Sequence, residues 1–170
     1  AFQKSLREDP QFYLSMMEQS YIYEEMGSMK EALHFAKEAV SMNDNNLDYQ
    51  KRLAFLYIDS GRFEESLACL KKLVDFEPNR FYNWYAYSEV LMLIGEFEDA
   101  ITVLNQATKL HNRAEIYYQL SNCYFHMNNQ KEGRKALDVA LNLDPNLLED
   151  MKLKYPFIKE EVEKVKTKKK

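Results

Sequence analysis

Three histidines are the side chains best suited to acid–base or metal chemistry, because imidazole titrates near neutral pH and binds transition metals. They are His34, His111 and His126. None belongs to an HxxH or HExxH pattern, and the surrounding periodicity places them in a helix, in a loop and at the end of another helix. We interpret them as partly exposed histidines and predict no metal site.

The candidate nucleophiles and acids are equally scattered. Cys69 and Cys123 each lie inside an apolar-periodic segment without a CxxC partner, which is typical of small buried side chains. Neighbouring carboxylates such as Glu64 and Glu65 fit the solvated face of a helix. The sequence contains no glycine-rich phosphate loop and no GxSxG motif. It therefore predicts no catalytic site, no cofactor and a chain that is not an enzyme.

The composition indicates a folded, mostly helical chain. Hydrophobic residues make up 46 % and charged residues 29 %, with four glycines and four prolines, which argues against disorder and a glycine-rich β architecture. No apolar run approaches the ~20 residues of a membrane-spanning helix. The formal net charge of −4 disfavours nucleic acid and membrane as partners. The unpaired cysteines favour a reducing compartment, so we predict a cytoplasmic location, which an upstream targeting segment would change.

A 34-residue repeat organises the sequence. Gly27, Gly61 and Gly95 are 34 residues apart, and Asn128 follows 33 residues later. Glycine and asparagine most readily adopt the left-handed conformation at the end of a helix. Between these residues, apolar side chains recur three and four apart in two stretches of about 12 to 14 residues per repeat. Each repeat is therefore predicted to be a pair of antiparallel helices joined by a tight turn.

These features resemble the tetratricopeptide repeat, a 34-residue helix pair with the pattern W-x2-L-G-x2-Y…A-x3-F…P. The residues that carry the resemblance are Trp84, Tyr87, Ser88, Leu91, Gly95, Ala100 and Leu104. The resemblance implies an all-α fold, a right-handed superhelical solenoid of antiparallel helix pairs, as in bacterial-type arrays of about four repeats with a C-terminal capping helix.

Other positions depart from the family pattern. Gln50 stands at the tryptophan position of its unit, Gly133 replaces the alanine of the second helix, and Asp44 and Asn112 replace the loop proline. A common register supports the resemblance more than any single position does. We interpret Trp84 itself as a structural residue that fills the gap between the helices of its own unit, in preference to a binding role.

The repeat frame divides the chain into seven segments. They are the end of a preceding repeat helix at 1–12, four units at 13–46, 47–80, 81–113 and 114–146, capping helices at 147–166, and a frayed basic tail at 167–170. Pro156 separates a short capping helix over 147–154 from a second that begins near 157. We expect the cap to cover the last repeat with Leu148, Met151, Phe157, Ile158 and Val162.

By the same resemblance, the first helices of successive repeats line a concave groove for an extended peptide or a partner helix. The groove positions are the second, fifth, ninth, twelfth and thirteenth residues of each unit. The twelve main candidates for peptide binding are Tyr21, Glu24, Glu25, Lys51, Phe55, Asp59, Tyr82, Tyr85, Glu89, Tyr118, Asn122 and Phe125. The other groove positions are Leu14, Met17, Asp48, Ile58, Met92, Leu93, Glu115 and His126.

Aromatic side chains and carboxylates dominate the predicted groove. A clamp for the acidic tails of chaperones needs several Lys, Arg and Asn side chains, and only Lys51, Arg52 and Asn122 could serve. Carboxylates favour a basic peptide, and tyrosines offer flat contact area and cation–π partners for Lys or Arg. We therefore predict a partner that is basic or contains aromatic residues. The alternative for each groove aromatic is simple packing between adjacent repeats.

The leading functional prediction is a non-catalytic protein–protein interaction scaffold that binds a peptide or a helix of a partner in an acidic, aromatic-lined groove. The alternative makes the chain a regulatory or assembly segment of a larger enzyme or sensor, whose active domain lies outside it. RNA recognition is a third interpretation, which the acidic groove disfavours. The uncovered first repeat would also allow a weak homodimer.

Overall fold

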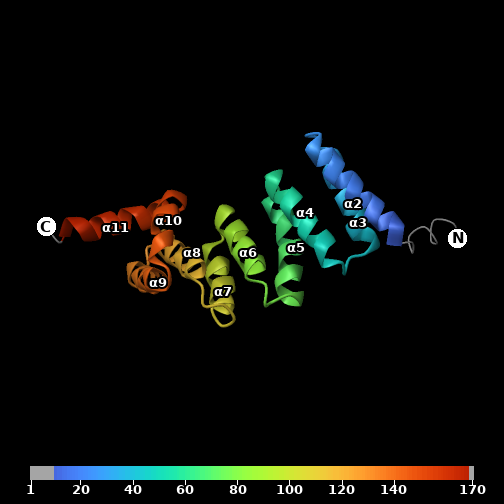
Figure 1. Ribbon diagram of the computed structural model, residues 1–170. Helices are drawn as coiled ribbons and strands as arrows, with labels where there is room; N and C mark the ends of the chain where they lie inside the picture. Colours follow the sequence, from blue (N-terminus) through green and yellow to red (C-terminus); the bar gives the residue numbers. More distant parts are fainter. Residues whose placement is uncertain (1–9, 169–170) are drawn as a thin grey trace. The chain divides into compact units, whose positions relative to one another are not determined.

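The computed structural model describes residues 10–168, and the chain is helical throughout this range apart from short turns. The first four helices are α2 (Pro10–Glu25), α3 (Met29–Met42), α4 (Leu47–Asp59) and α5 (Phe63–Phe76). The next four are α6 (Phe81–Leu93), α7 (Phe97–Ala107), α8 (Ala114–His126) and α9 (Gln130–Leu143). A 3-10 turn, η1 (Pro145–Leu147), leads to α10 (Leu148–Lys154) and α11 (Pro156–Lys168) (Figure 1). Residues 10–168 contain no strand, which confirms the all-α prediction.

The chain divides into two compact units. Unit 1 ends at Glu77 and unit 2 begins at Pro78. Unit 1 contains the antiparallel helix pairs α2–α3 and α4–α5, and unit 2 contains α6–α7 and α8–α9. Within each unit the second helix of one pair packs on the first helix of the next, through α3–α4 and α7–α8. Each unit is therefore a stack of two helix pairs, as expected of a helical repeat.

Four residues in the left-handed conformation end the first helices of the pairs. The φ angles are 74° at Gly27, 69° at Gly61, 88° at Gly95 and 59° at Asn128. In the first pair, the amide of Ser28 donates to the carbonyl oxygen of Tyr23 at 2.8 Å, which closes the helix in a Schellman motif. The predicted role of these four residues is confirmed, and it explains why asparagine is the one substitute for glycine in this column.

Small side chains allow the two helices of each pair to approach closely. The same position of the second helices carries Ala32, Ser66, Ala100 and Gly133, all of them buried. At Gly133 a Cβ atom would lie 2.5 Å from the ring of Phe125. The absence of a side chain at Gly133 therefore leaves the space that the Phe125 ring fills in the core.

In two of the helix pairs the residue at the tryptophan position is bonded to the loop before its helix. Trp84 is 6 % exposed, and its Nε1 donates to the carbonyl oxygen of Pro78 at 2.7 Å. Gln50, at the same position one repeat earlier, donates from Nε2 to the carbonyl oxygen of Asp44 at 2.9 Å. Both side chains fix the loop at the start of their helix, which supports the structural interpretation of Trp84.

The ends of the described chain differ from the expected boundaries by a few residues. α2 begins at Pro10, before the expected start of the first unit at 13, and the rest of the expected preceding helix, residues 1–9, lies outside the described residues. α11 continues to Lys168, into the segment expected to be frayed, and residues 169–170 are outside the described part. None of the helices between residues 10 and 168 is long and apolar enough to span a membrane.

Candidate binding faces

One side of unit 1 carries an open cavity between two first helices. Tyr21 on α2 and Asp48, Lys51, Arg52 and Phe55 on α4 line this cavity, whose volume is about 580 Å³. Tyr21 is 50 % exposed and Phe55 is 42 % exposed, so both aromatic rings are accessible to a ligand. We call these five residues the α2–α4 face.

Three contacts fix the side chain of Arg52, the least exposed charged residue of this face. Its Nη1 forms an ion pair with the carboxylate of Glu24 at 2.6 Å, and its guanidinium lies 3.9 Å from the centroid of the Tyr21 ring. Its Nη2 donates to the carbonyl oxygen of Ser20 at 3.1 Å. The Arg52 side chain is 9 % exposed. The Arg52 charge is therefore compensated by Glu24, and the Tyr21 ring is held in place by the guanidinium.

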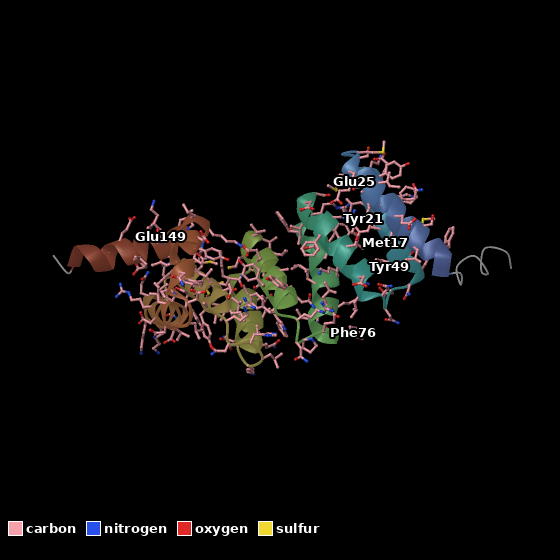
Figure 2. All side chains as sticks on the ribbon, in the orientation of Figure 1. Met17, Tyr21, Glu25, Tyr49, Phe76 and Glu149 are labelled. Carbon is pink, nitrogen blue, oxygen red and sulfur yellow. The ribbon has the colours of Figure 1, made fainter. Side chains whose placement is uncertain are left out.

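A small core cluster supports the face from below. Met17 on α2, Ala39 on α3 and Tyr49 on α4 pack together. Met17 and Tyr49 lie close to each other, and Tyr21 and Glu25 follow Met17 along α2 (Figure 2). Because the core residue precedes Tyr21 by about one helical turn, the aromatic ring is positioned on a rigid element instead of a loop.

Exposed carboxylates occur on both helices that line the cavity of unit 1. Glu25 and Asp59 are exposed at the last residues of α2 and α4, and Asp48 is exposed where it lines the cavity. Lys51 is the exposed cation among the lining residues. Among the lining residues Asp48 balances Lys51, and Glu24 compensates Arg52, so the negative excess that favours a cationic ligand comes from Glu25 and Asp59 at the helix ends.

In unit 2 the corresponding positions are mostly covered. We call Tyr85, Glu89, Tyr118, Asn122 and Phe125 the α6–α8 face. Tyr118 is 0 %, Phe125 1 % and Asn122 4 % exposed, so these three side chains do not contact solvent as a groove would require. This corrects the expectation of an open groove along α8. Tyr82 on α6, at 72 %, remains exposed.

Each of the three buried side chains on α8 is occupied within unit 2. The Phe125 ring fills the space above the glycine of α9. Nδ2 of Asn122 donates to Sδ of Met92 at 3.6 Å. The hydroxyl of Tyr118 donates to the carbonyl oxygen of Asp144 at 3.4 Å, and burial raises the pKa of this hydroxyl. These side chains therefore contribute to the core of unit 2.

The C-terminal segment reaches α6 through two consecutive residues. Nζ of Lys154 donates to Oε2 of Glu89 at 2.7 Å and to the hydroxyl oxygen of Tyr85 at 2.8 Å, and it lies 4.8 Å from the centroid of the Tyr85 ring. The hydroxyl of Tyr155 donates to the same Glu89 oxygen at 3.3 Å. We call these interactions the Lys154–Tyr155 contact.

The protonation states of Lys154 and Tyr155 suit this contact. Burial disfavours the charged Lys154 ammonium, but its hydrogen bonds with Glu89 and Tyr85 outweigh burial and raise the pKa of Lys154. Burial, together with the charge of Glu89, raises the pKa of the Tyr155 hydroxyl. Both groups therefore keep their protons at neutral pH and donate to the carboxylate.

Gln119 extends the contact to α8. Its Nε2 donates to Oε2 of Glu89 at 3.1 Å, and its Oε1 accepts from the hydroxyl of Ser88 at 2.8 Å. Gln119 is fully buried. One carboxylate, that of Glu89, thus joins α6, α8 and the C-terminal segment in a single polar network.

α11 has its own attachment to the last helix pair. Glu161 is 3 % exposed and forms ion pairs with Arg134 of α9 at 3.0 Å and with Lys164 at 2.8 Å. Burial opposes the charged carboxylate, but hydrogen bonds from Lys164 and Arg134 outweigh it and lower the pKa of Glu161. Ile158 is fully buried. The end of the chain is therefore packed against unit 2 by both apolar and ionic contacts.

His126 lies between two phenylalanine rings. Its ring stacks on Phe97 of α7 at 4.2 Å between centroids and meets the edge of Phe157 of α11 at 4.3 Å. Burial lowers the pKa of His126. The imidazole therefore acts as an aromatic packing element between the last repeat and α11, and it favours the neutral form.

The chemistry available to catalysis is limited in the described part of the chain. Residues 10–168 contain no group of three His, Cys, Asp or Glu side chains that could hold a metal ion. Burial raises the pKa of Cys69 to about 11 and that of Cys123 to about 12. Both thiols are therefore protonated at neutral pH and poorly suited to nucleophilic chemistry. The polar arrangements described above are hydrogen bonds and ion pairs within the chain.

Sequence analysis missed three residues of the α6–α8 network. Gln119 gave no signal, because a single glutamine in a helical pattern has many possible roles. Lys154 and Tyr155 did give a sequence signal, because they belong to the basic and aromatic string "KLKYPF". That string has the chemistry expected of a partner peptide, and it lies in the chain itself.

Comparison with known proteins gives a partial match to a human protein. The chain is 25 % identical to Protein O-mannosyl-transferase TMTC1 from Homo sapiens over 134 residues, or 78 % of this chain. The chain spans 15 % of the length of that relative.

Family and structural comparisons agree on the repeat architecture. The tetratricopeptide repeat family matches residues 24–83, and the family of anaphase-promoting complex, cyclosome, subunit 3 matches residues 71–140. The crystal structure of MamA protein is similar with a TM-score of 0.73 at 20 % identity, covering 91 % of this chain and 88 % of that one. A MamA RS-1 double mutant has a TM-score of 0.70 at 22 % identity, covering 91 % and 93 %. The two family matches, with the helix pairs and their left-handed turn residues, support a tetratricopeptide-repeat protein, and the solved structures share its helical-repeat fold.

Proposed function

We propose that the chain is a non-catalytic interaction scaffold whose α2–α4 face binds a peptide or helix that carries basic and aromatic side chains. The observation that carries this proposal is the open cavity of unit 1, lined by the half-exposed rings of Tyr21 and Phe55, with the exposed carboxylates of Glu25 and Asp59 at the ends of the same two helices. The repeat fold supports a role in protein interaction at the general level.

The geometry of the cavity suits an aromatic or aliphatic anchor. Aromatic rings offer large contact areas and lose little conformational entropy when a ligand binds. Tyr21 is already held by Arg52, which reduces that loss further. A ligand side chain would insert between Tyr21 and Phe55, while a neighbouring Lys or Arg would pair with Glu25 or Asp59.

The α6–α8 face already binds a lysine and a tyrosine of the chain itself, which is the ligand chemistry proposed for the α2–α4 face. There, a lysine and a tyrosine are held by the carboxylate of Glu89 and the ring of Tyr85. An acidic ligand in the cavity of unit 1 would instead bring its carboxylates toward Glu25 and Asp59, at a cost in electrostatic free energy.

Fluorescence anisotropy with short labelled peptides tests the proposal. A peptide with Lys and Tyr residues should bind, and a matched peptide with Glu in place of Lys should not. Tyr21→Ala and Phe55→Ala should each weaken binding about tenfold, the size typical of an interface anchor. The control is Phe76→Ala, because Phe76 is 65 % exposed on α5 of the same unit and outside the face (Figure 2).

Two results would contradict the proposed site. The first is a preference for the acidic peptide. The second is an equal loss of affinity in Phe76→Ala and Phe55→Ala, which would mean that binding depends on general exposed apolar surface.

A second candidate function is that of a repeat segment within a larger enzyme, and the partial match to TMTC1 favours it. In that case the α2–α4 face would serve assembly or regulation of the larger protein. Purification of the native protein with an antibody against this chain, followed by intact-mass measurement, distinguishes the two. A mass close to 20.2 kDa would contradict this candidate, and a larger polypeptide with an enzymatic domain would support it.

A further inference from the structure

We propose that Tyr85 and Glu89 of the α6–α8 face, with Gln119 beside them, form a second binding site for basic–aromatic segments, which the chain's own residues 147–168 keep occupied. The competing partner is a helix or peptide in which a lysine directly precedes an aromatic residue, the pair that Lys154 and Tyr155 present. This site lies within unit 2, and it does not depend on the function proposed for the α2–α4 face.

The carboxylate of Glu89 makes the site selective for ligands that donate hydrogen bonds. Its Oε2 accepts hydrogen bonds from Lys154, Tyr155 and Gln119, and its side chain is only 22 % exposed. A carboxylate buried to this degree is stable only when donors surround it. The face therefore favours a ligand that supplies an ammonium group, and a hydroxyl beside it.

Tyr85 adds a preference for a cation. Its ring lies 4.8 Å from Nζ of Lys154, and its hydroxyl oxygen accepts from the same nitrogen at 2.8 Å. A lysine or arginine satisfies both interactions at once, and a neutral side chain satisfies neither fully. Tyr85 and Glu89 are also positions at which the repeat frame predicts contact with a ligand.

The buried part of the segment explains the need for an aromatic residue. Tyr155 is 5 % exposed and Ile158 is fully buried, so removal of the segment exposes apolar surface on unit 2. A competing ligand must cover that surface again, and an aromatic ring does so with few rotatable bonds.

The polar part of the contact is open to competition. Lys154 is 39 % exposed, and its neighbour Leu153 is 85 % exposed. Ion pairs that water reaches contribute little net free energy, because solvent competes for both partners. α10 has only seven residues, of which Met151 is buried, and it follows the short turn η1. These features allow a partner to replace the segment without unfolding the helix pairs.

The test uses the full chain and a fluorescent peptide with the chain's own residues 147–168. In the unaltered chain the tethered segment competes with the peptide, so the apparent Kd is the intrinsic Kd divided by the open fraction. Lys154→Ala in the chain weakens only the tethered copy, and we expect it to tighten peptide binding about three- to tenfold. The matched control is Lys159→Ala, which removes the same charge from an exposed position on α11.

Two further variants keep the test independent of folding. Tyr155→Phe deletes only the hydroxyl that donates to Glu89, so it should give a smaller gain of the same sign. Glu89→Gln combined with Lys154→Ala should abolish the gain, because a neutral amide no longer pairs with the lysine of the peptide. Fluorescence of Trp84, the single tryptophan, verifies that unit 2 stays folded in each variant.

Hydrogen exchange then locates the bound peptide. We expect new protection of the α6 and α8 amides when the peptide binds the Lys154→Ala chain. The inference is overturned if Lys154→Ala gives no gain, or if Lys159→Ala gives an equal one. Protection of α2 and α4 instead would also overturn it, while that same result would support the function proposed for unit 1.

Discussion

Phe55 on α4 and Phe125 on α8 both lie on the first helix of a repeat, yet Phe55 is 42 % exposed and Phe125 is 1 % exposed. Two neighbours of Phe125 account for the difference. Gly133 leaves room for its ring in the core, and the C-terminal segment packs on the same helix. Exposure of a repeat position is therefore decided by the elements that pack on it as well as by the repeat pattern.

The largest expected effect is the difference in the free energy of unfolding between Phe125→Ala and Phe55→Ala. Phe125→Ala should lower the free energy of unfolding of unit 2 by about 3–5 kcal/mol, because it leaves a cavity in a closely packed site. Phe55→Ala should cost under about 1 kcal/mol, because its ring is already half in water. Urea unfolding followed by Trp84 fluorescence reports on unit 2, and circular dichroism reports on the whole chain. Similar losses in the two variants would contradict the assigned difference in burial.

Gly133→Ala sharpens the same comparison from the other side of the contact. Alanine is normally the better helix former, so a gain would be expected in an open helix. Here the new Cβ would meet the Phe125 ring at 2.5 Å, and we expect a loss of about 1–3 kcal/mol by overpacking. Thermal unfolding measures the loss, and adding Phe125→Leu should recover part of it. A stabilised Gly133→Ala chain would show that the ring is not confined there.

Replacement of Lys154 and of Lys51 by alanine should differ by less in the free energy of unfolding. Lys154→Ala should destabilise unit 2 by up to about 1 kcal/mol, because this partly exposed ammonium bridges the C-terminal segment and α6. Lys51→Ala, on the open face, should change stability by less. The Lys154 effect should shrink at high salt, as screening weakens the ion pair. Urea unfolding at low and high salt measures both effects, and equal values for the two lysines would remove the distinction between the faces.

The smallest expected effect is the pH dependence of unit 2. Because burial lowers the pKa of His126, the unfolded chain takes up a proton more readily than the folded chain. The stability linked to neutral His126 is therefore fully present above the ordinary histidine pKa of about 6.5 and is lost as the pH falls through the lower folded-state value. Because His126 is partly exposed and solvent screens its charge, we expect a small loss, well under about 1 kcal/mol, between pH 7.5 and 5.5, absent in His126→Phe. Denaturant titrations at these pH values measure it, and an unchanged slope in His126→Phe would assign the effect elsewhere.

The sequence predicted the repeat more fully than it predicted the faces. Gly27 and Asn128 could be assigned correctly because a left-handed helix end depends on local backbone sterics. The burial of Tyr118 could not, because it depends on tertiary packing, including the contact with Asp144, 26 residues later. The cap was expected over the last repeat, but no periodicity indicates that Lys154 reaches Glu89, a contact that spans 65 residues. Contacts of this kind arise from tertiary packing, and the sequence indicates them only through the residue types involved.

Hydroxyl-radical footprinting with mass spectrometry tests the contrast between an open and an occupied face most directly. The same oxidant meets Tyr21 and Phe55 in unit 1 and Tyr118 and Phe125 in unit 2 within one sample, so each pair is the internal reference for the other. We expect rapid labelling of Tyr21 and Phe55 and strong protection of Tyr118 and Phe125, as their exposed fractions require. Labelling of Tyr118 and Phe125 at the rates of the unit 1 aromatics would contradict the burial of these α8 side chains in the core of unit 2.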